Sequence, residues 1–292
     1  MQQNKGLAWL ILIVLSLIWG SSFILMKRGL EAFSSGQVAA LRIGIAFIVL
    51  LPLLVKYYKI NLKKYWLGLV GMGVFGNLIP AFLFTKAETG ISSSLAGMLN
   101  ALTPLFTVII GVLAFKNKTG VLQIAGIFIG FGGALILLSF ADGATTENNF
   151  TYSLLVVLAT LCYAISVNTI RRFLSDLNSV TATVWSFCFI GPAALVYLFT
   201  TDVFTVVQQH PKAMSSLGYI SILAIVGTAL SVVFFNVLIK LSGAVFASSC
   251  TYLIPVVAIV WGVFDGEKTN AVQLLSIFVI LAGIWLINKK KV

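Results

Sequence analysis

The sequence predicts an all-α integral membrane protein with ten transmembrane helices, arranged as two inverted five-helix repeats. Three observations predict it: the share of apolar residues, the spacing of the apolar runs and an internal repeat. Of the 292 residues, 60% are hydrophobic and 9% are charged, and the mean hydropathy is +1.07. Soluble chains hold roughly 25% charged residues, so a soluble enzyme and a disordered chain are both excluded.

The apolar runs are each close to the ~20 residues that a helix needs to cross a bilayer. Short segments connect them, so we expect no appended soluble domain. We expect an inner (plasma) membrane protein with both termini cytoplasmic, because that orientation leaves thirteen of the nineteen lysines and arginines inside and five outside. The predicted spans are residues 7–26, 34–55, 66–84, 91–115, 120–140, 151–170, 180–200, 215–239, 243–264 and 270–288.

The net charge of +11 does not indicate nucleic-acid binding, because the basic residues stand at the ends of apolar runs, where they meet the headgroups. Cys162, Cys188 and Cys250 all lie within apolar runs, and an odd, apolar set is typical of packing residues rather than disulfides. His210, the only histidine, stands in a loop. We therefore expect no catalytic residues, no metal site and no cofactor.

The second half of the chain repeats the first. Leu17–Ser22 matches Leu161–Ser166 at an offset of 144, and Pro104 matches Pro255 at an offset of 151. Each match is weak alone, but the matches run in order through five spans.

We expect the first repeat over residues 1–144 and the second over residues 145–292. Each repeat holds an odd number of spans, so the second must enter the membrane from the opposite side. Inverted repeats are the architecture of many secondary transporters, which bind substrate near the membrane midplane. The sequence therefore predicts a carrier with a central site.

Several motifs along the chain, taken together, resemble a known family. They are Trp19–Phe23, Leu41–Arg42, Leu102–Pro104, Gly266–Thr269 and Leu281–Gly283. In combination they resemble the EamA-like members of the drug/metabolite transporter superfamily, over nearly the whole chain. The resemblance implies a ten-helix exporter of small metabolites, including amino acids and their derivatives, and does not specify a substrate.

The first half departs from the pattern of that family at Asn117, where the family usually has a glutamate. The second half has this glutamate as Glu267. A structural role for Glu267 is therefore expected in one half only.

Polar side chains inside apolar runs are costly unless they are paired or hydrated, so they indicate where a cavity lies. Several recur at matched positions of the two repeats, beside two matched aromatic residues. Such a neutral girdle suits a small polar or zwitterionic metabolite. Hydrogen bonding between helices is the ordinary alternative for each residue. The expected substrate-binding residues are Trp19, Ser22, Asn77, Asn100, Tyr163, Ser166, Thr228 and Thr251.

Two further asparagines and an arginine also fall within the spans. Asn168 and Asn236 are candidates whose repeat counterparts are not both polar. Arg42 is the only charge deep in a predicted span. It either pairs with carbonyls or with an acid such as Glu31 or Glu88, or it attracts an anionic substrate group. Charges inside membranes usually pair internally, which favours the structural role.

Gly126 and Gly130 have the small-xxx-small spacing that lets two helices approach closely. This spacing commonly serves packing within one bundle. We therefore expect a monomer, with a homodimer through this face as the alternative.

The predicted function is an exporter of small polar or zwitterionic, amino-acid-like metabolites that works by alternating access between the repeats. Its partners are a small-molecule metabolite and the lipid bilayer. A proton-coupled drug or metabolite antiporter and a non-transporting membrane scaffold are the alternatives. Every Asp and Glu stands at a predicted helix end or in a loop, so we expect transport without a carboxylate titrating at the membrane centre.

Overall fold

Helices make up the described part of the chain, and strands are absent from it. This computed structural model describes residues 5–116, 120–139, 147–243, 246–247 and 249–288. Asn117 and the boundary between residues 144 and 145 lie outside the described residues.

The chain is an integral membrane protein built from helices, as predicted. Three of its apolar helices are shorter than a full crossing, so the number of ten crossings stays a prediction; they are Val121–Leu137, Ile254–Phe264 and Ala271–Leu286. Within the described residues, seven helical segments are long and apolar enough to cross a membrane: Gly6–Gly29, Ser35–Tyr57, Leu62–Ala87, Ser93–Leu113, Phe150–Phe173, Ser179–Phe199 and Ala213–Ser242.

The helices of the two halves follow the predicted apolar runs except Val203–Gln209 (α11), which lies in the predicted connection between residues 200 and 215. In the first half they are α1 (Lys5–Gly29), α2 (Ser35–Leu50), α3 (Leu54–Tyr57), α4 (Leu62–Gly73), α5 (Ile79–Ala87), α6 (Ser93–Leu99), α7 (Thr103–Leu113) and α8 (Val121–Ser139). In the second half they are α9 (Glu147–Phe173), α10 (Ser179–Phe199), α11 (Val203–Gln209), α12 (Ala213–Ala224), α13 (Ser231–Ser242), α15 (Ile254–Phe264) and α16 (Ala271–Asn288).

Side-chain caps fix several helix starts, where the first N–H groups have no partner within the helix. Ser34 and Gln37 form a capping box at α2, each side chain accepting from the backbone N–H of the other. Ser92 caps α6 by accepting from the N–H of Leu95 at 3.2 Å. Asn178 caps α10 in the same way.

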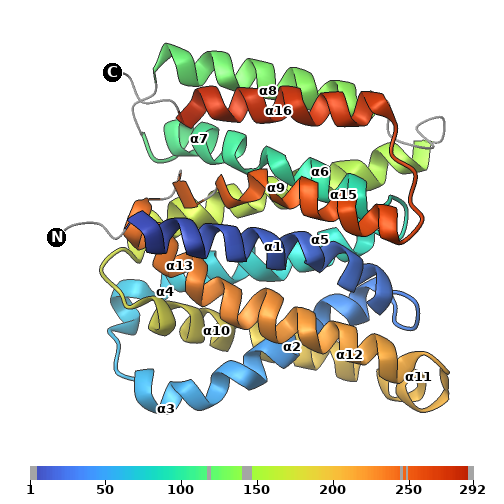
Figure 1. The fold of residues 1–292 in the computed structure, drawn as a ribbon. Helices are drawn as coiled ribbons and strands as arrows, with labels where there is room; N and C mark the ends of the chain where they lie inside the picture. The colour runs from blue at the N-terminus through green and yellow to red at the C-terminus, as the bar shows by residue number, and fades with distance from the viewer. Residues whose placement is uncertain (1–4, 117–119, 140–146, 244–245, 248, 289–292) are drawn as a thin grey trace.

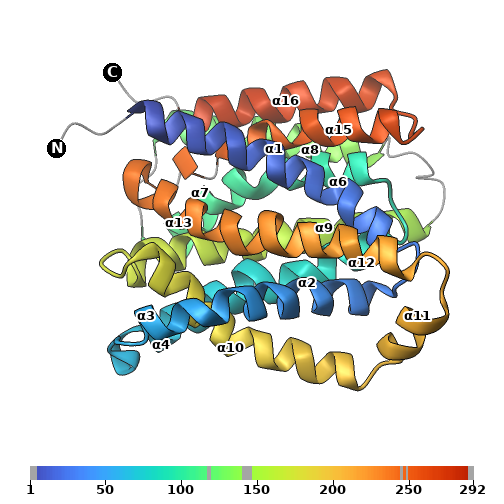
Figure 2. The ribbon, with the colours of Figure 1, turned by 60° about the horizontal axis from the view of Figure 1, so that its bottom comes forward.

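The helices lie side by side as one bundle (Figures 1 and 2). The pair α8 and α16 forms one flank, and α2 and α10 lie toward the opposite flank. The start of α1 and the end of α16 lie at the same end of the bundle. We call this the Lys64 end, because α4 begins there, and the other the Lys27 end, because α1 finishes there.

Backbone contact joins α8 to α16. A Cβ added at Gly283 would lie 2.5 Å from the backbone oxygen of Gly126 and 2.5 Å from the backbone nitrogen of Gly130. The small-residue face of α8 therefore packs within the chain against α16. That is the use expected for a monomer, and the oligomeric state itself stays a prediction.

Breaks interrupt four helical segments at matched positions of the two halves. The π-helical turns η2 (Val74–Leu78) and η4 (Ile225–Leu230) begin 151 residues apart, which is the offset of the internal repeat. The 3₁₀ turns η3 (Asn100–Leu102) and η5 (Ser249–Tyr252) are likewise matched. Turns of this kind inside helices are frequent at functional sites because they release backbone carbonyls.

Prolines follow three of these breaks. Pro80 lies in the first turn of α5 after η2, Pro104 in the first turn of α7 after η3, and Pro255 in the first turn of α15 after η5. A proline tolerates this position because it has no N–H to leave unpaired. Each proline therefore lies where a new α-helix begins after a break.

Candidate functional site

A cavity of about 100 Å³ lies between the two halves, and residues of all four helix breaks line it. Thr228, one of the eight predicted residues, does not line the cavity, but its hydroxyl binds the side chain of Arg42, which does. The structure thus brings the predicted residues together, and their role in binding stays a prediction. The other seven of the eight line the cavity: Trp19, Ser22, Asn77, Asn100, Tyr163, Ser166 and Thr251.

Arg42 of α2 also lines the cavity, and its side chain is buried. Its Nε donates to Oγ1 of Thr228 at 2.7 Å, and its Nη1 lies 3.8 Å from the sulfur of Met26. Tyr163 interacts with the same guanidinium. The hydroxyl of Thr228 donates in turn to the backbone oxygen of Leu223 at 3.1 Å.

No carboxylate among the described residues lies within 4.0 Å of the Arg42 guanidinium. Glu31, one of its two expected partners, instead pairs with Arg28 and Lys212. The ion pair that would make Arg42 purely structural is therefore not formed in the described part of the chain.

Two aromatic pairs cross between the halves at the cavity wall. Trp19 of the first half packs edge-on against Phe235 of the second, with ring centroids 5.1 Å apart. Tyr163 of the second half stacks on Phe84 of the first at 5.8 Å. The offsets of the internal repeat place Trp19 on Tyr163 and Phe84 on Phe235. The two pairs thus join matched positions of the repeats, edge-on in one and stacked in the other.

A serine of each half packs against a glycine in the helix break of the other half. A Cβ at Gly76 would lie 2.4 Å from Oγ of Ser166, and one at Gly227 would lie 3.1 Å from Oγ of Ser22. The indole Nε1 of Trp19 donates to the backbone oxygen of Gly227 at 2.9 Å. A side chain at Gly76 would displace Ser166, and one at Gly227 would require a smaller shift of Ser22 and Leu223.

Polar side chains beside the breaks bind carbonyls that the π turns release. Nδ2 of Asn77 donates to the backbone oxygen of Met72 at 3.4 Å, and the hydroxyl of Ser166 approaches the same oxygen at 3.5 Å. Both bonds are long, so these groups keep capacity to bind a solute.

The two further asparagines have different surroundings. Asn168 donates to the backbone oxygens of Thr107 and Ala164, both at 2.9 Å, and does not line the cavity. Asn236 of α13 lines the cavity, donates to Thr183, and its Oδ1 is buried without a hydrogen-bond partner.

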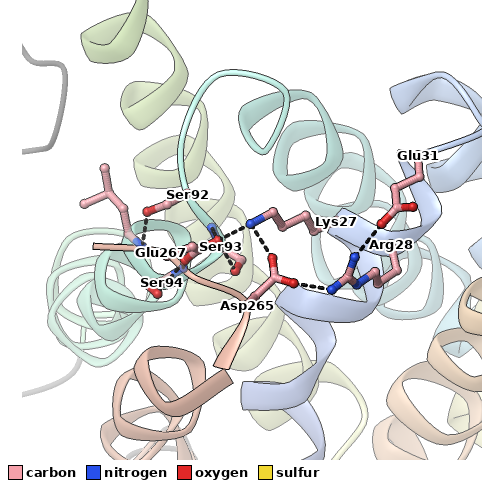
Figure 3. Close-up of polar contacts among 9 residues, drawn as sticks. Lys27, Arg28, Glu31, Ser92, Ser93, Ser94, Asp265 and Glu267 are labelled. Carbon is pink, nitrogen blue, oxygen red and sulfur yellow. Dashed lines mark hydrogen bonds and ion pairs between the residues drawn. The ribbon is translucent and has the colours of Figure 1, made fainter. Parts of the chain in front are cut away.

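A cluster of charged residues joins the two halves at the Lys27 end (Figure 3). Nζ of Lys27 lies 2.6 Å from Asp265 and 2.7 Å from Glu267. Arg28 pairs with Asp265 and with Glu31. We call these five residues the Lys27 cluster. Lys212, before α12, adds a 2.6 Å contact to Glu31.

Glu267 also caps the start of α6, which belongs to the other half (Figure 3). Its Oε1 accepts from N and Oγ of Ser93 at 3.1 and 2.8 Å, and its Oε2 from N and Oγ of Ser94 at 3.0 and 2.6 Å. Burial alone would raise the pKa of Glu267, but the hydrogen bonds from Lys27, Ser94 and Ser93 outweigh it and lower the pKa to about 2.

Glu88 follows α5 and lies close to the Lys27 cluster. It stands at a helix end, as predicted, but it is buried, and neither side-chain oxygen has a hydrogen-bond partner. Burial raises the pKa of Glu88 well above its ordinary value, and the charge of Glu267 raises it further, while Lys27 and Arg42 oppose this. Glu88 is thus a buried acid placed between the charged cluster and Arg42.

The Lys64 end is held by a weaker charged contact. Lys64 lies 2.5 Å from Asp176, which also accepts from the hydroxyl of Tyr65 at 2.8 Å. Both charged side chains are more than half exposed, whereas that of Glu267 is 6% exposed. Exposed pairs stabilise little because water screens them.

Sequence reasoning did not find the Lys27 cluster as a unit. It joins residues 27–31 to residues 265–267, which lie more than 230 positions apart in the sequence. The only signal was the presence of a basic motif at the end of the first span and an acidic one before the last. No group of three or more His, Cys, Asp or Glu in the described ranges is placed to hold a metal ion.

The model of the EamA-like transporter family matches residues 5–139 and again residues 150–289. The chain belongs to the EamA-like transporter family. The match falls once on each half, in agreement with the internal repeat. Membership identifies a multi-pass membrane transporter.

Relatives of this EamA-like chain match it over nearly its full length. The uncharacterized transporter YyaM of Bacillus subtilis is 25% identical, with 94% of this chain and 92% of the relative covered. The uncharacterized inner membrane transporter YedA of Escherichia coli K12 is 26% identical, with 96% and 90% covered. A Salmonella typhimurium protein named "Probable amino-acid metabolite efflux pump" is 24% identical, with 98% and 95% covered.

A solved crystal structure shares the fold of this EamA-like transporter. The TM-score is 0.67 at 16% sequence identity, and 96% of each chain is covered. The whole bundle, rather than one half, is therefore common to both.

Proposed function

We propose that this protein exports small polar or zwitterionic, amino-acid-like metabolites across the inner membrane by alternating access between two inverted five-helix repeats. The observation that carries the proposal is the central cavity, which both halves line with matched helix breaks. The names of the Salmonella typhimurium and Escherichia coli relatives support the substrate class and the membrane.

In the proposed topology the chain crosses the membrane ten times, with both termini in the cytoplasm. The seven long segments and the three shorter apolar helices supply the crossings. Positive charge on cytoplasmic loops then places the Lys64 end inside and the Lys27 end outside.

The proposed cycle starts from an outside-closed state. The Lys27 cluster joins the halves with several partly buried charged contacts, whereas an exposed pair holds the Lys64 end. Rocking of one repeat against the other breaks the first set and opens the cavity outward. A carrier must break these contacts in each cycle, so the free energy of each one must be small. A hydrogen bond to a charged group contributes about 1.5–3 kcal/mol, which meets that requirement.

Inversion of the repeats has a direct test. The offset of 151 places Lys59 of the first half on His210 of the second. In the proposed topology these matched positions face opposite sides of the membrane. A cysteine at Lys59 should react with an impermeant maleimide from the inside only, and one at His210 from the outside only; labelling from one side in both variants contradicts the proposal.

Flux is tested by a metabolite efflux screen in proteoliposomes, repeated with Asn100→Ala and Thr251→Ala. These residues line the cavity from matched breaks, so both variants should lose at least about tenfold in rate, the effect of removing about 1.4 kcal/mol of binding. Ser139→Ala is the control, because Ser139 is exposed on α8 and bonds only its own helix. Unchanged flux in both cavity variants removes this cavity from the transport path.

Glu88 favours one second candidate, a proton-coupled antiporter. A buried acid without a hydrogen-bond partner, beside the Lys27 cluster, suits a group that takes up and releases a proton during the cycle. An imposed pH gradient should then drive uphill flux in the native protein but not in Glu88→Gln. Equal uphill flux in both excludes Glu88 as the proton site.

A further inference from the structure

We infer that the cavity binds a small zwitterion with its carboxylate on Arg42 and its ammonium group on Asn236. This inference rests on the proposed function and assigns the two charged groups of the substrate to named side chains. Two independent observations carry it. One is a buried guanidinium with no carboxylate within 4.0 Å among the described residues, and the other is a buried amide oxygen without a donor.

Arg42 is held by Thr228 and also interacts with Tyr163, and neither partner is a carboxylate. The hydroxyl of Thr228 gives its proton to the backbone oxygen of Leu223 and accepts from Nε of Arg42. These two bonds fix the position of Nε of Arg42. Its Nη1 faces the sulfur of Met26, a weak acceptor. A carboxylate accepts two parallel bonds from a guanidinium and neutralises the buried charge, so it is the complementary ligand.

Asn236 presents an acceptor to the same cavity, and its amide orientation follows from its neighbour. The hydroxyl of Thr183 donates its one proton to the backbone oxygen of Ser179 at 2.9 Å. It can therefore only accept from Asn236, which must turn Nδ2 toward it, at 2.9 Å. The Oδ1 of Asn236 then points away and has no donor. A buried acceptor of this kind is costly until a donor reaches it, and an ammonium group is a strong one.

The two groups stand apart along one helical segment. Thr228, which holds Arg42, and Asn236 are eight residues apart, about 12 Å along a helix axis. An acid without an amine would leave the Asn236 oxygen unpaired, and an amine without an acid would leave the Arg42 charge uncompensated. Aromatic and aliphatic walls, among them Phe235 and Ile254, suit an apolar side chain.

The test uses purified protein and probes that differ in one charged group. Leucine carries both groups, leucinamide lacks the carboxylate, and 4-methylpentanoate lacks the ammonium group. 6-Aminohexanoate carries both groups farther apart. We expect the native protein to bind leucine or 6-aminohexanoate at least tenfold more tightly than either single-charge probe.

Two variants separate the two contacts. Arg42→Met should weaken zwitterion binding at least tenfold and leave leucinamide binding unchanged. Asn236→Leu should weaken zwitterion binding at least tenfold and leave 4-methylpentanoate binding unchanged. A merely structural residue would weaken all probes together. Arg42→Lys and Asn236→Asp serve if the first variants do not fold: the lysine should retain part of the carboxylate preference, and the aspartate should tighten leucinamide binding.

Failure of the inference is distinct from failure of the proposed function. If the native protein transports metabolites in the screen but binds neither zwitterion, or if each folded variant weakens all probes equally, the inference is wrong and the transporter remains. If no metabolite is transported, the proposed function itself fails.

Discussion

The indole Nε1 of Trp19 lies 2.9 Å from the backbone oxygen of Gly227, so the first helix of one half binds a carbonyl in the π-helical turn of the other. The same indole ring packs edge-on against Phe235. A rocking movement of the halves must change this contact. Trp19 therefore links the wall of the cavity to the relative position of the repeats.

Trp19→Phe should destabilise the protein by about 1–3 kcal/mol, because the carbonyl of Gly227 stays buried and loses its donor. The midpoint of thermal unfolding in detergent measures this. Trp261→Phe is a matched control: its indole donates to Ser21 at an exposed site, and Ser21 also bonds the backbone oxygen of Leu17. Equal losses in the two variants would show that ring volume, not the bond to Gly227, matters.

The length of the apolar runs and the internal repeat predicted the helices, because a segment that crosses lipid must satisfy its backbone N–H and C=O groups by hydrogen bonds within itself. The run predicted at 66–84 lies within the observed segment Leu62–Ala87. The π turn inside it was not predicted, because it depends on packing between Gly76 and Ser166 rather than on local propensity. The matched positions in both halves were the only available signal.

The candidate site could be predicted in part, since polar residues at matched depths indicate a shared centre. The partners of the charged groups could not, because they depend on which helices meet. Arg42 was expected to have a structural role through carbonyls or through an acid such as Glu31 or Glu88. Glu31 is paired with two other cations, and the side chain of Arg42 binds that of Thr228 instead. Glu267 was expected to have a structural role without a counterpart in the first half, where Asn117 stands instead. Its partner, the start of α6, could not be predicted because it lies more than 170 residues earlier in the chain.

Glu267→Gln should open the Lys27 end. The neutral amide loses the ion pair with Lys27 and turns an NH₂ group toward donors of Ser93 or Ser94. We expect a loss of about 1.5–3 kcal/mol, the usual contribution of a hydrogen bond to a charged group, and faster labelling from the outside of a cysteine at Thr103 in the cavity. Asp176→Asn, which removes the exposed pair at the other end, should leave this labelling rate unchanged; a slower rate in Glu267→Gln contradicts the prediction.

Low pH should weaken the contacts of Glu267 by protonating its carboxylate. The pKa of Glu267 is lowered from 4.5 to about 2, so its contribution to stability is complete above pH 4.5 and is lost as the pH falls toward 2. The native protein should therefore lose more stability over this interval than Glu267→Gln does. Unfolding midpoints measured at several pH values decide this, and parallel curves for the two proteins would show that Glu267 is not the group that titrates.

Glu88 should produce the opposite dependence. Its pKa is raised by burial, so the folded protein holds a proton that the unfolded chain releases above about pH 4.5. Stability is then highest below this ordinary pKa and decreases as the pH rises through the raised one. Glu88→Gln imitates the protonated form and should remove the decrease that begins above about pH 4.5. A decrease of the same size in the variant would assign it to another group.

Two adjacent glycines of α8 differ in how closely they pack against α16, so alanine at each position should have a different effect on stability. A Cβ at Gly133 would lie 2.9 Å from the backbone nitrogen of Ile280 in α16, whereas one at Gly132 would meet nothing within 4 Å. Gly133→Ala should therefore destabilise the protein by about 1–3 kcal/mol, because backbone cannot move aside. Gly132→Ala should be neutral or stabilise by about 0.5–1 kcal/mol through the better helix propensity of alanine. Thermal unfolding compares them, and equal effects would mean that α8 and α16 do not touch in this register.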